Sequence, residues 1–231
     1  MVNQKQSSWE SMLARKKEEK EKEEKPPENE TSLLILNSAP KESKRIRIIS
    51  LYGDINEEKS EEAVLGMMAL KEAGADPVFK DPDDPTSEII NMTYEPFQAY
   101  ISTWGGSAAD MFAIYDTMRM IREDCEIHTI GMGKVMSAGA LLLSAGTKGK
   151  RSIGKNCRVM LHSVIGGNHG PISKLENEME EIRWTQAQHI HALVEETDMT
   201  KRYITKLLDR KVNAYLSAKE AVELGIADII I

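Results

Sequence analysis

The chain has 231 residues, of which 41% are hydrophobic, and a formal net charge of -7 at pH 7. This length allows one large domain, or one domain with appendages, built around a real hydrophobic core. The acidic balance argues against a nucleic-acid binder, because phosphate contacts require a basic surface. The two cysteines, Cys125 and Cys157, are too few for a disulfide framework and fit a reducing, cytoplasmic location.

The N-terminal residues predict neither a secretory signal nor a membrane anchor. The opening stretch MVNQKQSSWESMLARKKEEK lacks the apolar core of a signal peptide. The longest apolar stretch, around Ser137, is too short to cross a bilayer. The run KKEEKEKEEKPPENE alternates Lys and Glu and predicts at most a solvated helix. We therefore expect a charged, mobile arm over residues 1–44, followed by a single domain over residues 45–231, and no membrane partner.

Strand-like and helix-like segments alternate along this domain, a pattern that predicts an α/β fold with a largely parallel sheet. The expected strands cover residues 45–53, 96–102, 126–131 and 156–162. The expected helices cover residues 57–74, 109–123, 171–196 and 216–228. Asn56 and a capping box from Ser217 to Glu220 mark two helix starts. A Pro- and Asp-rich stretch over 74–88 predicts a surface loop.

The stretch GKVMSAGALLLSAG places Ser137 where the third strand turns into a helix of small residues. Backbone N–H groups at a helix start can stabilise negative charge on a bound group, and an oxyanion needs two such donors about 3 Å away. The amide of Ala138 is one candidate donor. The pair Gly105-Gly106, at the end of another strand, can approach closely enough to supply the second. His162, at the end of the fourth strand, is the candidate base.

The same residues also fit a purely structural role. Ser137 can be a packing or capping residue, and His162 can be an ordinary hydrogen-bonded histidine. The complete Gly-x-Ser-x-Gly elbow is absent, because position 135 is valine. A metal site is not expected, because His189 and His191 fall on different helical faces and no HExxH motif or cysteine cluster is present. No cofactor is expected either.

Four ordered blocks of the sequence resemble the proteolytic subunit of Clp protease, a family of serine peptidases. The blocks are IYDTM (114–118), GMGKVMSAGALLLSAGTKGKR (131–151), NCRVMLHSVIGG (156–167) and YLSAKEAVELGIAD (215–228). The resemblance covers residues 45–231, apart from a surface insertion at 74–94. It implies a ClpP-like, crotonase-like α/β core with a long handle helix, a Ser-His-Asp triad, and two stacked heptameric rings that enclose the active sites. It also implies unfolded polypeptides and peptides as substrates, delivered by a separate AAA+ unfoldase, because this chain has no nucleotide-binding motif.

The resemblance assigns a role to individual residues of this chain. The nucleophile falls on Ser137, the general base on His162, and the oxyanion-hole amides on Gly106 and Ala138. The substrate-binding positions are Gly105, Gly166 and Gly167, the last two where an extended substrate can add as a strand.

The third triad position departs from the family, because Asn213 stands where an aspartate is expected. An amide oxygen can accept a hydrogen bond from the imidazole, but it cannot neutralise the imidazolium that forms during attack. Three interpretations follow: Asn213 orients the histidine, Asp209 one helical turn earlier reaches in, or the subunit is weakly active and mainly structural. Trp104 replaces the family's proline before Gly-Gly, and Val212 replaces a charged residue that joins the rings.

Two further functions stay open at this point. A viral capsid-maturation protease of the same fold would share the serine and the histidine but act on one scaffold protein without an unfoldase. A non-catalytic ring subunit would contribute docking surface to an active paralogue. Acyl-CoA enzymes of the crotonase type share the core architecture, but they do not explain the spacing of Ser137 and His162.

Overall fold

The computed structural model describes residues 46–84, 86–167, 169–209 and 212–231, so the arm expected over 1–44 lies outside the described residues. In chain order the elements are β1 (Ile48–Ile55), α2 (Glu57–Ala73), β2 (Ala75–Phe79), β3 (Ile89–Tyr94), β4 (Phe97–Gly106), α3 (Ala108–Ile121), β5 (Ile127–Met136), α4 (Ala138–Ser144), β6 (Ser152–Ile153), β7 (Arg158–Leu161), α5 (Ile172–Glu196), α6 (Lys201–Leu208), β8 (Ala214–Leu216), α7 (Ala218–Glu223) and β9 (Ile229–Ile230).

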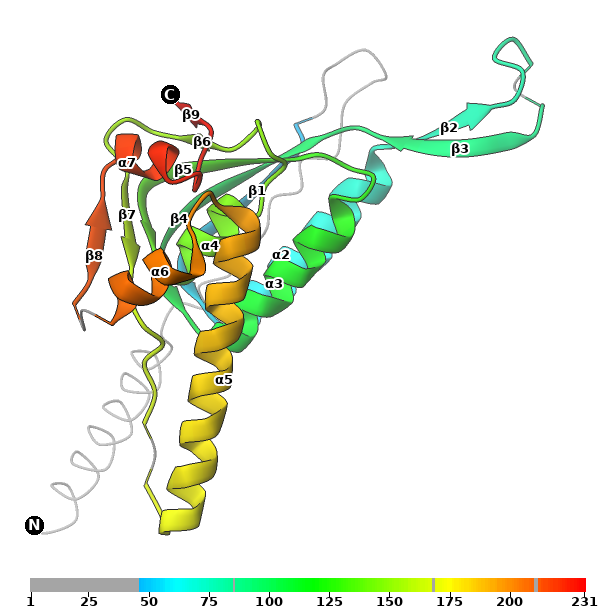
Figure 1. The fold of residues 1–231 in the computed structure, drawn as a ribbon. Helices are drawn as coiled ribbons and strands as arrows, with labels where there is room; N and C mark the ends of the chain where they lie inside the picture. The colour runs from blue at the N-terminus through cyan, green and yellow to red at the C-terminus, as the bar shows by residue number, and fades with distance from the viewer. Residues whose placement is uncertain (1–45, 85, 168, 210–211) are drawn as a thin grey trace, which may run out of the picture. The chain divides into compact units, whose positions relative to one another are not determined.

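The central feature is a seven-stranded sheet in the order β1-β4-β5-β6-β9, with β7 and β8 branching from β5 (Figure 1). Each neighbouring pair is parallel except β7 and β8, which are antiparallel. The sheet divides along β5, whose first half pairs with β6 and whose second half pairs with β7. The predicted α/β fold with a largely parallel sheet is therefore confirmed.

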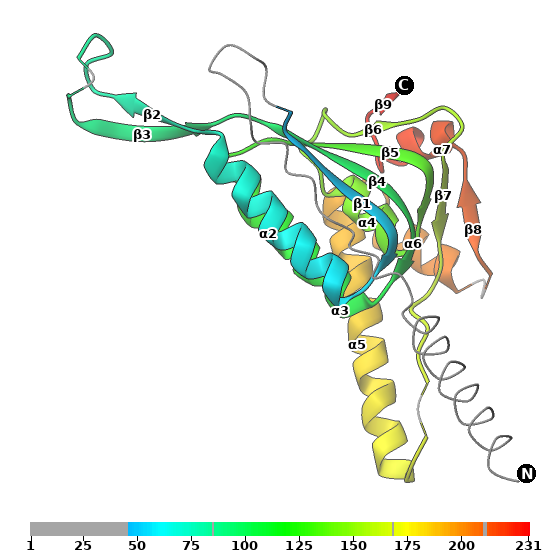
Figure 2. The same cartoon turned by 180° about the vertical axis from the view of Figure 1, so that it is seen from behind.

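The helices pack against the sheet and against one another through their apolar residues. α2 lies on β1 and beside α3, while α4 packs on β4 and β5 and against α5, as both ribbon views show (Figures 1 and 2). Leu141, Leu142 and Leu143 of α4 are completely buried, which places this short helix in the core. The caps predicted from sequence are present: the Asn56 side chain accepts a hydrogen bond from the Lys59 amide at 2.9 Å, and Ser217 and Glu220 form a capping box.

The long helix α5 is only partly covered by the rest of the chain. Its buried residues all lie in the last third: His189, Ala192, Leu193 and Glu196. The first turns project beyond the sheet, as Figure 1 shows. This arrangement is the long handle helix expected from the sequence. No helix in the described part of the chain is both long and apolar enough to cross a membrane.

The prediction of an irregular loop over 74–88 is wrong. β2 and β3 form a separate antiparallel two-stranded sheet, and only the residues between them form a turn. The loop was predicted partly because of Pro77, since proline usually disrupts a strand. In a two-stranded sheet both strands are edges, and a residue without an N–H group is tolerated there.

Candidate active site

Ser137 occupies a strained turn between β5 and α4. Its backbone angles are φ 54 and ψ -117, and it is the only non-glycine residue with a positive φ among the described residues. Such a backbone costs about 1–3 kcal/mol and is found preferentially at functional sites. Its amide donates to the carbonyl of Met160 at 2.8 Å, which ties the turn to the end of β7.

The glycine pair at the end of β4 lies directly against this serine. A Cβ built on Gly105 would lie 2.5 Å from the Cβ of Ser137 and 3.0 Å from its Oγ. Gly105 and Gly106 both have positive φ angles, 98 and 156, and a side chain on Gly106 would overlap the Ile55 backbone. The amide of Gly105 donates to Thr103 Oγ1 at 2.9 Å. The structure thus brings together Ser137 and the glycine pair, as the sequence predicted.

His162 directly follows β7, two residues beyond the carbonyl that accepts from the Ser137 amide. Its ring is half-buried, and Nδ1 lies 2.6 Å from the carbonyl oxygen of Ser163. Because a carbonyl only accepts hydrogen bonds, Nδ1 must carry the proton in this contact. The tautomer with a lone pair on Nε2 is therefore selected, and that is the nitrogen a general base needs.

Asn213 immediately precedes β8, and His162 immediately follows β7. The last pair of the antiparallel ladder between these strands is Leu161 with Ala214, so His162 and Asn213 each adjoin a member of that pair. Asn213 is exposed, and the Nδ1 hydrogen bond of His162 goes to the Ser163 carbonyl.

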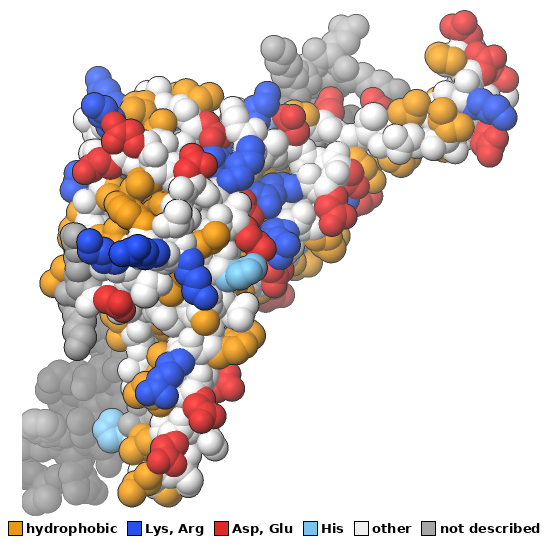
Figure 3. All heavy atoms as spheres, in the orientation of Figure 1, with side chains coloured by type: hydrophobic (Ala, Val, Ile, Leu, Met, Phe, Trp, Pro, Cys, Tyr) orange, Lys and Arg blue, Asp and Glu red, His pale blue; other side chains and the backbone are white. Residues whose placement is uncertain are grey.

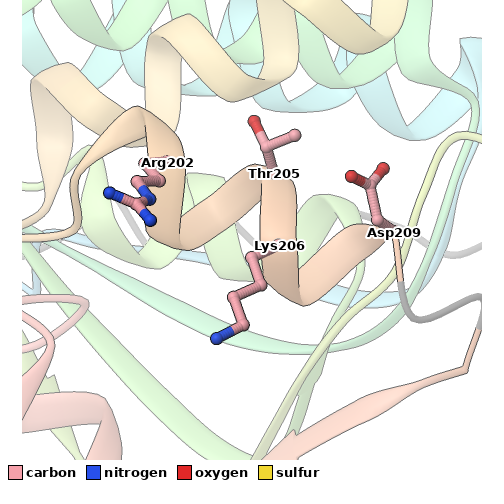
Figure 4. A pocket seen from close by; sticks show the side chains of 4 residues that line it. All are labelled: Arg202, Thr205, Lys206 and Asp209. Carbon is pink, nitrogen blue, oxygen red and sulfur yellow. The ribbon is translucent and has the colours of Figure 1, made fainter.

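Asp209, the alternative orienting residue, ends helix α6. It lines a surface pocket of about 530 Å³ together with Arg202, Thr205 and Lys206 of the same helix (Figure 4). Its surroundings in the described structure are therefore those of a helix surface with two basic neighbours.

The segment after His162 is attached to α5. The amide of Val164 donates to Gln186 Oε1 at 2.6 Å, and a Cβ on Gly166 would lie 2.6 Å from Ile182 Cδ1. Gly166 and Gly167 are both exposed and lie outside any strand, and Gly167 has open space around it. The backbone of this segment is thus accessible, although the structure does not pair it with a strand.

Two residues near the site were not assigned a role from sequence. His189, one turn after Gln186 on α5, is buried, and its Nε2 has no hydrogen-bond partner among the described residues. Burial, with a smaller contribution from the nearby His162, lowers the pKa of His189 to about 4, so its ring is neutral at pH 7.

Trp104, adjacent to Gly105, is exposed, with Lys134 Nζ 5.1 Å from its ring centre. In the described ranges, no three His, Cys, Asp or Glu side chains are grouped to hold a metal ion.

A serine in a strained strand-to-helix turn against a glycine pair, with a histidine at the end of the strand to which its amide bonds, is typical of serine hydrolases. A family model described as Clp protease matches residues 90–231. The chain is 36% identical over 154 residues to the "ATP-dependent Clp protease proteolytic subunit 1" of Prochlorococcus marinus strain MIT 9312, covering 67% of this chain and 73% of that protein. The protein of the same name from Prochlorococcus marinus subsp. pastoris (strain MED4) is also 36% identical over 154 residues, covering 67% and 72%. The chain belongs to the Clp protease family, a family of serine peptidases, and has the ClpP-like α/β fold.

Proposed function

We propose that Ser137 is the nucleophile of this peptidase and His162 its general base. His162 Nε2 takes the proton of Ser137 Oγ as the oxygen attacks a peptide carbonyl, and returns it to the leaving amine. The amides of Gly106 and Ala138 donate hydrogen bonds to the oxyanion. Water then releases the acyl group by the reverse proton transfers. No metal ion or cofactor takes part.

The backbone of Ser137 is the observation that carries this proposal. A packing or capping serine needs no strained φ, and the Ser137 side chain makes no capping hydrogen bond to α4. The strain is instead accounted for by a turn that places Oγ against Gly105 while the Ser137 amide bonds to the end of β7. We assign Asn213 to orient His162 together with the Ser163 carbonyl, because Asn213 immediately precedes β8, whose Ala214 pairs with Leu161, the neighbour of His162.

The exposed face of α5 supports self-assembly. Ile172, Leu175 and Met179 recur at helical spacing on one stripe, and all three are exposed. Contiguous exposed apolar side chains of this kind mark protein contacts. We infer that copies of this chain join through α5 and form two stacked heptameric rings with the active sites inside.

The substrates and the partner follow from the family and from what this chain lacks. The curated relatives are named as ATP-dependent, and this sequence contains no nucleotide-binding motif. We therefore assign ATP hydrolysis to a separate AAA+ unfoldase that delivers unfolded polypeptides to the ring. Cleavage of short peptides needs no ATP in this arrangement.

Intact-mass labelling with a fluorophosphonate tests the catalytic assignment. Wild type is expected to gain one adduct per chain, and Ser137→Ala none, while both sediment as the same large assembly. If the wild-type protein assembles but stays unlabelled and hydrolyses no peptide, the catalytic proposal is wrong and the chain is a non-catalytic ring subunit. A labelled monomer would keep the chemistry and overturn the ring.

A further inference from the structure

The hairpin formed by β2 and β3 has one apolar face and one mainly polar face, on which Val78 is the apolar exception. The register pairs Pro77 with Met92 and Phe79 with Ile89, and paired residues share a face of the sheet. Ile90 and Tyr94 alternate with Met92 along β3 and so extend the same face, and the register shift between Val78 and Phe79 leaves Ile90 as an extra residue beside the Phe79–Ile89 pair. The opposite face carries Asp76 with Thr93 and Val78 with Asn91.

No described residue covers this apolar face fully. Ile89 is 55%, Ile90 60% and Met92 37% exposed. Both ribbon views show the hairpin extending past the end of α2, away from the main sheet, and the space-filling view shows hydrophobic side chains along it (Figures 1, 2 and 3). A two-stranded hairpin is marginally stable in water unless something covers its apolar face. A partner surface is therefore required to account for its sequence.

The base of the hairpin is held firmly, so its direction is defined. Arg47 donates to the carbonyls of Leu70 at the end of α2 and of Glu95 after β3, at 2.6 and 2.7 Å. Lys71 Nζ lies 4.7 Å from the ring centre of Tyr94. A side chain on Gly74 would collide with the Arg47 guanidinium, which keeps this junction tight.

The turn of the hairpin is acidic. Residues 80–88 contain four acidic side chains and one basic one, a formal charge of -3 (Asp81, Asp83, Asp84 and Glu88 against Lys80). Asp84 accepts from both the amide and the hydroxyl of Thr86, at 2.9 and 2.7 Å. A suitable partner surface thus combines exposed apolar side chains with basic ones.

The opposite edge of the main sheet has these properties. Among the described strands β9 pairs only with β6 and so forms an edge, and Ile229, Ile230 and Ile231 are 46%, 44% and 58% exposed. The exposed Lys155 lies beside them, because its amide donates to the Ile231 carbonyl at 2.9 Å. The one acidic residue at this edge, Asp228, is already paired with Arg151.

We propose that the β2–β3 hairpin of one copy docks its apolar face on the β9 edge of the next copy, with its acidic turn toward Lys155. The hairpin leaves the β1 side of the sheet and β9 closes the other side, so the contact is head-to-tail. Head-to-tail contacts between identical subunits close into rings. This inference rests on the self-assembly in the proposed function and names an intra-ring contact within it. Hairpin-to-hairpin packing would instead bring two turns of like charge together.

Cysteine cross-linking between two full-length variants tests the contact. Ile90→Cys protein, altered on the hairpin's apolar face, is mixed with Ile230→Cys protein, altered on β9, and mildly oxidised. The native Cys125 and Cys157 are buried and do not interfere. We expect a covalent dimer, at a yield at least tenfold above that of a mixture in which Asn91→Cys, on the polar face, replaces Ile90→Cys.

The other outcomes separate this inference from the proposed function. A covalent dimer from Ile90→Cys alone would show hairpin-to-hairpin packing and overturn the β9 contact. The β9 contact is also overturned if the mixture of Ile90→Cys and Ile230→Cys assembles and cleaves peptides but yields no more cross-linked dimer than the Asn91→Cys mixture. A wild-type chain that stays monomeric would overturn the ring as well.

A second pair of variants gives an independent readout. Ile90→Ser with Met92→Ser is expected to raise the protein concentration needed for half-assembly at least tenfold, measured by sedimentation. Asn91→Ser should leave it unchanged. Equal assembly of both variants would overturn the contact.

Discussion

Gly105 and Ser137 approach so closely that a Cβ on the glycine would lie 2.5 Å from the Cβ of the serine. We therefore expect Gly105→Ala to displace either the proposed nucleophile, Ser137, or the adjacent proposed oxyanion donor, the Gly106 amide. Loss of one such donor lowers kcat about 10²–10³-fold. The rate of fluorophosphonate labelling should fall by this factor while the protein still assembles.

Gly149→Ala provides the matched control for backbone strain. Gly149 also has a positive φ, 82 compared with 98 at Gly105, but a Cβ there would have nothing within 4 Å. Gly149→Ala should lose stability on the order of 1 kcal/mol from the positive φ alone, and Gly105→Ala should lose more, because its Cβ must also displace neighbouring atoms. If Gly149→Ala slows labelling as much as Gly105→Ala, the close approach to Ser137 is not the cause.

In the proposed site, Asn213 and the Ser163 carbonyl divide the role that an aspartate has in the usual triad. Because the Ser163 carbonyl already selects the useful tautomer, Asn213→Ala should slow labelling only about tenfold, far less than the ~10⁴-fold that a wrong tautomer costs. Asn213→Asp should raise the rate at least tenfold, since a carboxylate stabilises the imidazolium.

Asp209→Ala supplies the control, because Asp209 lines a pocket on the α6 surface. Its labelling rate should match wild type. A large loss in Asp209→Ala, with no effect in Asn213→Ala, would transfer the orienting role to Asp209.

The sequence was most informative where chemistry restricts the backbone. The small residues around Ser137, the Gly105-Gly106 pair and the strand-end His162 each predicted a local structure, and parallel strands then brought these ends together at one edge. The helix caps at Asn56 and Ser217 were also predicted correctly, because each cap depends on residues only three positions apart.

Features that depend on distant residues were not predicted. The hairpin was not predicted because the Pro and Asp residues in this stretch are typical of a loop. Its strand structure becomes evident only from the pairing of β2 with β3. The two-residue strands β6 and β9 carry too little periodicity to recognise. The Ser163 contact of His162 also had no sequence signal, because any residue at 163 supplies a carbonyl.

A buried ion pair joins α3 to the end of α5. Arg122 donates to both carboxylate oxygens of Glu196 at 2.7 and 2.8 Å, and the Glu196 side chain is 4% exposed. Removing one partner leaves an uncompensated buried charge, so Arg122→Ala should lower the free energy of unfolding by about 3–5 kcal/mol in urea titrations. Lys219→Ala, which removes the exposed pair with Glu223, should change it by less than about 0.5 kcal/mol.

The same pair predicts an acid dependence. Burial alone would raise the pKa of Glu196, but the hydrogen bonds from Arg122 outweigh it and the net shift is downward. A lowered folded-state pKa contributes stability above the unfolded value of 4.5, and this is lost as the pH falls through the folded value. The difference in unfolding free energy between wild type and Arg122→Ala should therefore shrink below about pH 4.5. A constant difference down to pH 3 would contradict this assignment.

His189 gives a separate dependence at higher pH. Its pKa of about 4 lies below the unfolded value of 6.5, so below pH 6.5 the unfolded chain takes up a proton that the folded chain does not. Stability is therefore complete above pH 6.5 and falls between pH 6.5 and 4, by on the order of 3 kcal/mol in total.

His189→Leu should remove this loss, because leucine is similar in size, does not titrate and leaves no unpaired nitrogen in the core. Between pH 7.5 and 5.5 wild type should lose about 1 kcal/mol more unfolding free energy than His189→Leu in urea titrations at fixed protein concentration. His191→Leu changes a histidine on the same helix whose side chain is 71% exposed, so it should keep the wild-type dependence. If His189→Leu loses as much stability as wild type over this range, the buried ring of His189 is not the group that titrates.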